Sequence, residues 1–178
     1  MSLSALAVEV SGIRYDETIK VAGKDLKLNG AGLRKKFVVK LYTAGLYLPE
    51  KATTVPDVLK QEGPRRVAIV MLRNISSEDF GTAYMKGLND NINDQEKAKI
   101  AQQLAIAGQL FASLDGLKKG DVLNLDWIPG TGSVYSLNGR RIGEVFPDIA
   151  YYNAMLRIWL GNNPVDTGLK PRLLGETR

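Results

Sequence analysis

The sequence predicts an α+β fold, in which a large antiparallel sheet is covered on one face by a layer of helices. Strand-like segments come first, helix-like segments follow, and strands and a helix then return, without the regular alternation that parallel sheets show. The dipeptide Asn138-Gly139 lies between two alternating runs, 133–137 and 140–145, and this pattern is typical of an antiparallel hairpin.

Short alternating runs in the first third predict strands over 8–10, 13–15, 18–21 and 25–28. Residues 29–32, Asn-Gly-Ala-Gly, are predicted to be a flexible break that could bring backbone close to a ligand. A long strand is predicted from Phe37 to Leu48, where Pro49 ends it. The apolar run 67–72 predicts a central strand that is covered on both faces.

Capping residues mark the predicted helices. Pro56 suits the first turn of a short helix over 55–62. Ser76 or Ser77 can cap the next helix, and Asn93 with Glu96 forms a capping box for one long helix that Gly120 closes. After a strand over 122–128, a helix is predicted over 149–160 and a short helical tail over 169–174.

Composition excludes several kinds of chemistry. The chain of 178 residues has no Cys and no His, so it offers no thiolate nucleophile, zinc–sulfur site or histidine base, and we expect no metal and no cofactor. The net charge of +5 is spread along the chain, and the basic runs are too short and too poor in aromatic residues for a nucleic-acid footprint. No apolar run approaches the roughly 20 residues that span a bilayer.

Residues 1–7 are interpreted as an expression scar followed by the small-residue end of a removed signal peptide. This predicts a periplasmic or secreted protein. No linker or repeat divides residues 8–178, which we expect to form a single domain and a monomer.

The segment from Gly30 to Leu48 holds the candidate ligand residues. Arg34 could meet a carboxylate or an enolate with two parallel hydrogen bonds, although a solvated basic loop with Lys35 and Lys36 is the simpler interpretation. In a regular strand Tyr42 shares one face with Val38, Lys40, Ala44 and Leu46, as expected of a cleft wall, but a packing role is the simpler interpretation for the tyrosine too. Gly45 within the strand indicates a bulge or a close approach.

Aromatic residues on the predicted helices are more easily explained as core than as ligand contacts. These residues are Phe80, Tyr84, Tyr151, Tyr152 and Trp159.

Two separated segments resemble the chalcone isomerase-like family, and more narrowly its bacterial branch. They are 29–48, from Asn29-Gly30 through Arg34 to Leu48, and 156–175, with Arg157-Ile158-Trp159 and the final Leu174-Gly175. The resemblance implies an open-faced β-sandwich with a ligand cleft between the sheet and the helices. Arg34 matches the cleft arginine of the family, and Tyr42 stands where fatty-acid-binding relatives have tyrosine and the enzymes have threonine.

The resemblance implies three possible functions. The first is non-enzymatic binding of a fatty acid or similar apolar acid, with Arg34 and Tyr42 on the head and Val38, Ala44 and Leu46 along the tail. The second is a chalcone isomerase-type lyase acting on a phenolic enone, with Arg34, Tyr84 and Asn91. The third is an interaction module whose cleft is plugged by Phe80 or Trp159. Binding is the preferred interpretation.

Two features of the match need explanation. Eight steps of regular strand would hold Arg34 and Tyr42 about 26 Å apart, so both can serve one headgroup only if the chain kinks or bulges near Lys35 and Lys36. The helix that carries the enzymes' tyrosine and asparagine has two registers, which place either Phe80 and Gly87 or Tyr84 and Asn91 at the cleft. The first register is preferred, and we include Phe80 and Tyr84 among the candidate ligand contacts.

Overall fold

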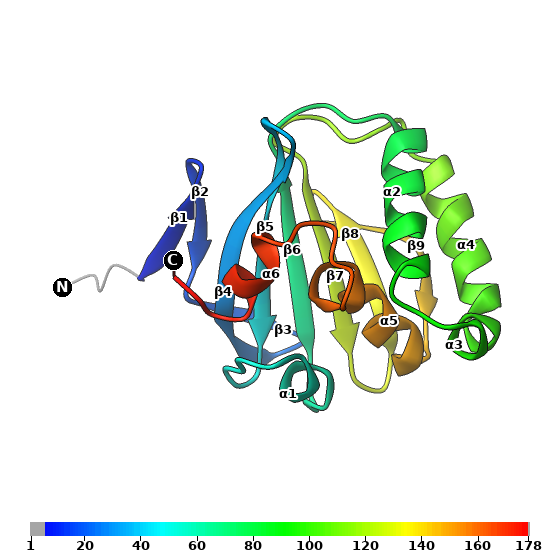
Figure 1. The fold of residues 1–178 in the computed structure, drawn as a ribbon. Helices are drawn as coiled ribbons and strands as arrows, with labels where there is room; N and C mark the ends of the chain where they lie inside the picture. The colour runs from blue at the N-terminus through cyan, green and yellow to red at the C-terminus, as the bar shows by residue number, and fades with distance from the viewer. Residues whose placement is uncertain (1–5, 178) are drawn as a thin grey trace.

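The computed structural model describes residues 6–177, and its main feature is a curled antiparallel sheet of seven strands in the order β3-β4-β5-β6-β7-β8-β9 (Figure 1). Strands of this sheet that are consecutive in the chain pair antiparallel, even where helices lie in the connection, as between β5 and β6 and between β6 and β7. The strands are β3 (Thr18–Val21), β4 (Lys24–Lys36), β5 (Val39–Leu48), β6 (Arg65–Met71), β7 (Val122–Ile128), β8 (Gly132–Leu137) and β9 (Arg140–Phe146).

A layer of helices covers one face of this sheet, so the predicted fold class is confirmed (Figure 1). Helix α5 has all but two of its side chains buried or nearly so, and it packs between the sheet and α2. The helices are α1 (Val55–Leu59), α2 (Ser77–Asn89), α3 (Asp94–Lys99), α4 (Ala101–Ala112), α5 (Ile149–Leu160) and α6 (Leu169–Leu173).

The main core lies between the sheet and the helices, and aromatic rings form its centre. Phe111 packs edge-on against Phe80, with ring centroids 5.0 Å apart, and it also contacts Tyr84 and Tyr135. Tyr151 and Tyr152 of α5 are fully buried in the same cluster. The five aromatic residues predicted to be core are therefore core.

A smaller core lies on the opposite face of the sheet. There the hairpin of β1 (Ala7–Val10) and β2 (Ile13–Asp16) covers part of the sheet. Tyr15 packs over Gly45, where an added Cβ would lie 2.7 Å from the tyrosine ring, and its hydroxyl is 2.7 Å from the Thr43 hydroxyl. The close approach predicted for Gly45 is thus to a side chain of the chain itself.

Strand β4 differs from its prediction. Residues 29–32 continue the strand instead of breaking it, and the two glycines let α6 lie directly against its backbone. A Cβ on Gly30 would lie 1.9 Å from the Arg172 carbonyl oxygen, and one on Gly32 would lie 2.8 Å from Leu169. The backbone approach that the glycines permit is therefore to α6.

The other elements follow the sequence closely. The Asn93–Glu96 capping box is present, and Asn138 and Gly139 both have positive φ in the β8–β9 turn. The single long helix predicted after Asn93 is instead two, because the backbone leaves helical geometry at buried Ile100 (φ −113°, ψ 12°). The predicted scar lies mainly in residues 1–5, which are outside the described part of the chain.

Candidate functional site

Arg34 and Tyr42 are cross-strand neighbours, although eight positions separate them in the chain. The chain turns back at Phe37 and Val38, so that β4 and β5 form a hairpin in which Arg34 pairs with Tyr42. Phe37 takes the left-handed conformation (φ 57°) that the turn requires. The 26 Å separation of a regular strand therefore does not apply, and the two side chains can serve one ligand group.

A β-bulge adjusts this hairpin beside the pair. The register passes from Arg34↔Tyr42 directly to Lys35↔Lys40, which leaves Leu41 as an extra residue on β5. The kink or bulge expected near Lys35 and Lys36 is therefore found as an extra residue on the partner strand, and the hairpin turn, not the bulge, brings Arg34 to Tyr42. Because Val39 pairs with Lys36, two positions along β4 from Arg34, the bulge brings Val39 to the same face as Arg34 and Tyr42.

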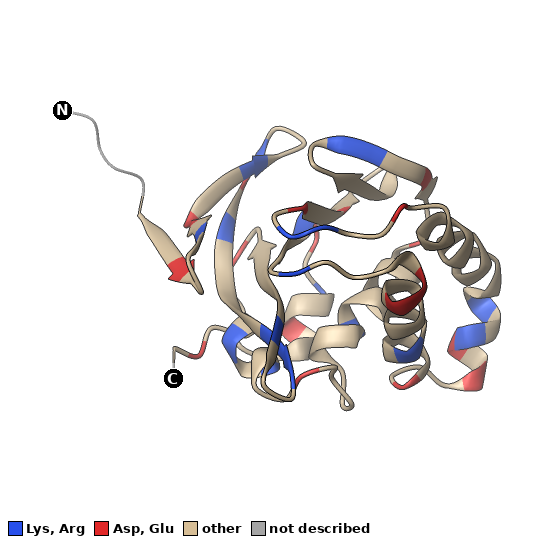
Figure 2. Ribbon diagram, turned by 90° about the horizontal axis from the view of Figure 1, so that it is seen from above, with Lys and Arg blue, Asp and Glu red and all other residues tan. Residues whose placement is uncertain are grey.

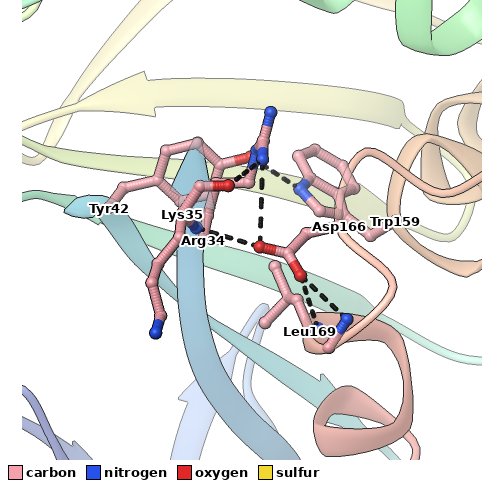
Figure 3. Close-up of polar contacts among 7 residues, drawn as sticks. Arg34, Lys35, Tyr42, Trp159, Asp166 and Leu169 are labelled. Atoms are coloured by element: carbon pink, nitrogen blue, oxygen red, sulfur yellow. Dashed lines mark hydrogen bonds and ion pairs between the residues drawn. The ribbon is translucent and has the colours of Figure 1, made fainter. Parts of the chain in front are cut away.

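Asp166 is the acidic partner of Arg34 (Figure 3). Its Oδ2 lies 3.8 Å from a terminal nitrogen of Arg34 and accepts a hydrogen bond of 2.9 Å from the Lys35 backbone N–H. Its Oδ1 accepts from the backbone N–H groups of Gly168 and Leu169, at 2.8 and 3.1 Å. Arg34 also donates to the Lys35 carbonyl oxygen. The loop between α5 and α6 therefore holds a carboxylate against the guanidinium.

Tyr42 is tied to the helical layer through Trp159 of α5. The indole N–H of Trp159 donates to the Tyr42 hydroxyl over 3.0 Å (Figure 3). Burial raises the pKa of Tyr42 above its usual value, while the Trp159 hydrogen bond and the nearby Arg34 act in the opposite direction. The phenol therefore stays protonated at neutral pH.

A groove of about 850 Å³ opens beside Arg34, between the start of β5, the loop after β6, helix α2 and the loop after α5. Apolar side chains line much of it, namely Phe37, Val39, Leu41, Ile75, Ala83 and Val165. Charged and polar side chains, including Lys36, Arg73 and Asp79, also line it. Gly87 lines the groove on the helical side, and a Cβ there would lie 2.8 Å from Ile158 of α5. The arrangement offers a charged head position at Arg34 and an apolar track beside it.

The residues predicted to follow a ligand tail lie elsewhere. Val38 is at the hairpin turn with 92% of its surface exposed. Ala44 and Leu46 are on the helical side of the sheet, fully buried in the main core. The bulge at Leu41 explains the difference only at Val38, because it puts Val39 on the face of Arg34 and Tyr42 and Leu41 in the groove wall. Ala44 and Leu46 do share the face of Tyr42, as predicted, but the helices cover them.

The candidate residues of α2 also face inward. Phe80 and Tyr84 belong to the main core, and the Tyr84 hydroxyl is bonded to those of Tyr151 and Tyr135, at 2.5 and 3.1 Å. Asn91 donates to the carbonyl oxygens of Gly87 and Asn163, so its side chain ties α2 to the loop after α5. The structure brings neither Tyr84 nor Asn91 to Arg34.

Sequence reasoning missed Asp166 and the Trp159–Tyr42 contact. Asp166 lies 132 positions from Arg34 and is followed by Thr167-Gly168, a pattern that reads only as a turn. Trp159 lies in the core, as its helical spacing predicts, with 4% of its surface exposed. No group of His, Cys, Asp or Glu among residues 6–177 is arranged to hold a metal ion.

Comparison with known proteins identifies the family of the chain. No curated protein sequence matches the chain. Among solved structures, a fatty-acid binding protein of Arabidopsis thaliana shares the fold, with a TM-score of 0.71 over 96% of both chains and 14% sequence identity. The family model described as chalcone isomerase-like matches residues 7–175. The chain therefore belongs to the chalcone isomerase-like family.

Proposed function

We propose that this protein binds a fatty acid or a similar apolar acid in the groove beside Arg34. The observation that carries the proposal is a groove with apolar walls that Arg34 lines, with Tyr42 paired to Arg34 on the adjacent strand. An arginine can hold a carboxylate through two charge-assisted hydrogen bonds, which are about twice as strong as neutral ones. The fold shared with a fatty-acid binding protein supports the proposal.

Tyr42 has a proton available for the same carboxylate. The indole N–H of Trp159 is a donor only, so the Tyr42 hydroxyl accepts that hydrogen bond and keeps its own O–H free to donate. Its raised pKa keeps the O–H in place at neutral pH. A ligand carboxylate at Arg34 would therefore meet a cation and a neutral donor from adjacent strands.

The tail of the ligand would lie along the apolar part of the groove. Val39, Leu41, Ile75 and Val165 line it together with Ala83 of α2. A volume of about 850 Å³ lies within the usual range for small-molecule sites. Each buried methylene contributes about 0.8 kcal/mol, so affinity should rise with chain length until the groove is filled.

The other two possible functions have less support. An isomerase would need Tyr84 and Asn91 near Arg34, but their side chains are bonded to other groups of the chain. Phe80 and Trp159 do fill the space between sheet and helices, as the interaction-module hypothesis expects. The groove, however, lies beside this space and remains open to a ligand.

Titration of delipidated protein, followed by native mass spectrometry, tests the proposal. Saturated fatty acids of increasing length should bind with increasing affinity, and Arg34→Gln should weaken acid binding by about 10- to 100-fold, the value of a hydrogen bond to a charged group. Tyr42→Phe should weaken it by a smaller factor. Arg140→Gln, at an exposed arginine of β9, is the matched control and should change nothing.

A fatty alcohol of the same length has the same apolar tail but no carboxylate, so it distinguishes recognition of the headgroup from burial of the tail. It should bind more weakly than the acid, and Arg34→Gln should leave its affinity unchanged. If acid and alcohol bind alike, or if Arg34→Gln retains full acid affinity, then Arg34 does not hold a headgroup and the proposal fails.

A further inference from the structure

The turn between β4 and β5 exposes two large apolar side chains together. Phe37 and Val38 each have 92% of their surface exposed, more than any other large apolar residue in the described part of the chain. Phe37 also adopts φ 57°, a left-handed conformation that is uncommon for a bulky residue. Glycine or asparagine would fit this turn with less strain, so folding alone gives no reason for this phenylalanine.

Basic residues surround the same turn. Arg34, Lys35 and Lys36 precede it and Lys40 follows it, and all three lysines are exposed. The positions of all Lys and Arg residues along the backbone are blue in Figure 2. No Asp or Glu occurs between Leu26 and Pro49, and Asp166, from the loop after α5, is paired with Arg34, so the positive charge at the turn comes from the three lysines. Arg73, from the loop after β6, lines the same groove as Lys36 and Phe37 and adds a further positive charge at this end of the sheet. The partner of this turn should therefore be anionic.

The shape of the turn favours a lipid surface over a protein partner. The turn lies at one end of the sheet, at the top in Figure 1, and its apolar part consists of two adjacent side chains. A stable protein interface buries about 800 Å² on each partner, which two tip residues cannot supply. An apolar tip among lysines fits the boundary between acyl chains and anionic headgroups.

We propose that the β4–β5 turn docks this protein on an anionic lipid surface, with Phe37 and Val38 inserted at the boundary and Lys35, Lys36 and Lys40 on the headgroups. Docking does not depend on the proposed ligand. If that ligand binds as proposed, its groove would open at the membrane, because Phe37 and Val39 line it.

Vesicle co-sedimentation tests the apolar part. The protein should bind phosphatidylcholine vesicles that contain phosphatidylglycerol and bind pure phosphatidylcholine vesicles much more weakly. The double variant Phe37→Ser/Val38→Ser should reduce binding to the anionic vesicles by about tenfold or more, because it removes the side chains that leave water. Leu6→Ser, at an exposed apolar residue away from the turn, is the control and should bind as the parent does.

A charge-matched pair of variants tests the basic part. Lys35→Gln/Lys36→Gln/Lys40→Gln should lower the partition constant by about 100-fold, from the usual contribution of a lysine near an anionic membrane. Lys24→Gln/Lys97→Gln/Lys99→Gln has the same net charge, with exposed lysines removed elsewhere, and should lose far less. Equal losses in the two triple variants would assign binding to diffuse charge and overturn the proposal.

Two further results would overturn it. One is equal binding to neutral and anionic vesicles. The other is a parent protein that does not bind vesicles but self-associates through the turn. Self-association would appear as a larger mass in solution for the parent than for Phe37→Ser/Val38→Ser. Tyr42→Phe distinguishes docking from ligand binding, because it should weaken fatty-acid binding and leave vesicle binding intact.

Discussion

Asp166 is a carboxylate that the fold already places against Arg34, outside the residues that line the groove. Its Oδ2 is 3.8 Å from the guanidinium, and both side chains are more than four-fifths buried, so solvent screens the pair only in part. A ligand acid would have to share Arg34 with this carboxylate or displace it. The loop after α5 thus sets the electrostatic cost of binding an anion.

Asp166→Asn should therefore strengthen binding of a fatty acid by roughly three- to tenfold, since it removes a like charge beside the head position. The amide oxygen can still accept one of the backbone N–H groups that now bond Asp166, which limits the damage to the loop. Titration with acid and with fatty alcohol measures the effect, and alcohol binding should not change.

Asp148→Asn is the matched control for that variant. It removes the same charge at the N-cap of α5, keeps a capping residue, and should leave acid affinity unchanged. Weaker acid binding by Asp166→Asn would mean that the carboxylate supports the site, most simply by positioning Arg34 and Lys35.

At the scale of elements, the contact between β4 and α6 depends on two glycines. Gly30 has no room for a Cβ, because the nearest atom is a backbone oxygen that cannot rotate away. Gly30→Ala should therefore destabilise the protein by about 2–4 kcal/mol, as overpacking against backbone does. Urea unfolding should show this loss.

Gly108→Ala provides the opposite case within α4. An added Cβ there meets nothing within 4 Å, so the substitution gains helix propensity without a clash. It should stabilise the protein by up to about 1 kcal/mol. If Gly30→Ala proved as harmless as Gly108→Ala, α6 would not pack on β4 as described.

Local signals account for the elements that the sequence predicts well. Caps at Ser76, Asn93 and Asp148 and the Asn138-Gly139 turn act within a few residues, so their partners are visible in the sequence. The β4–β5 hairpin has no such signal, because Phe37 occupies a position where glycine is usual. Because this turn lacks its usual residue, the sequence does not predict the pairing of Arg34 with Tyr42.

The site residues that the sequence did not predict depend on long-range packing. The contact of Asp166 with Arg34 and that of Trp159 with Tyr42 join the last quarter of the chain to its first quarter. The bulge at Leu41 then decides which alternate residues of β5 line the groove. The alternation of a regular strand consequently selects Val38 instead of Val39 and Leu41, whereas Ala44 and Leu46 do share the face of Tyr42 but are covered by the helices.

At the scale of the whole molecule, ionisable groups are unevenly distributed between surface and interior. All seven tyrosines have a raised pKa, and burial is the largest cause for each. For Tyr47 burial raises the pKa to about 12. The chain has no His, so no imidazole titrates between pH 6 and 8.

These shifts predict how stability depends on pH. An unfolded tyrosine loses its proton near pH 10, whereas a buried one keeps it, so the native state binds more protons in that range. The free energy of unfolding should thus be nearly constant from pH 6 to 9 and fall above pH 10, by up to about 1.4 kcal/mol per pH unit for each tyrosine that ionises only on unfolding. The loss should continue until the pH passes the raised pKa of the native residue.

Urea unfolding at a series of pH values, with tyrosinate absorbance as a second probe, measures this dependence. Absorbance should rise together with the loss of native structure, because the phenols ionise as they become exposed. Tyr47→Phe removes one titrating group and should make the alkaline decline shallower, while the free energy near neutral pH changes only by the lost hydrogen bond to the Asp16 carbonyl. Tyrosinate absorbance that appears near pH 10 in a protein still fully folded would show that these hydroxyls are not buried.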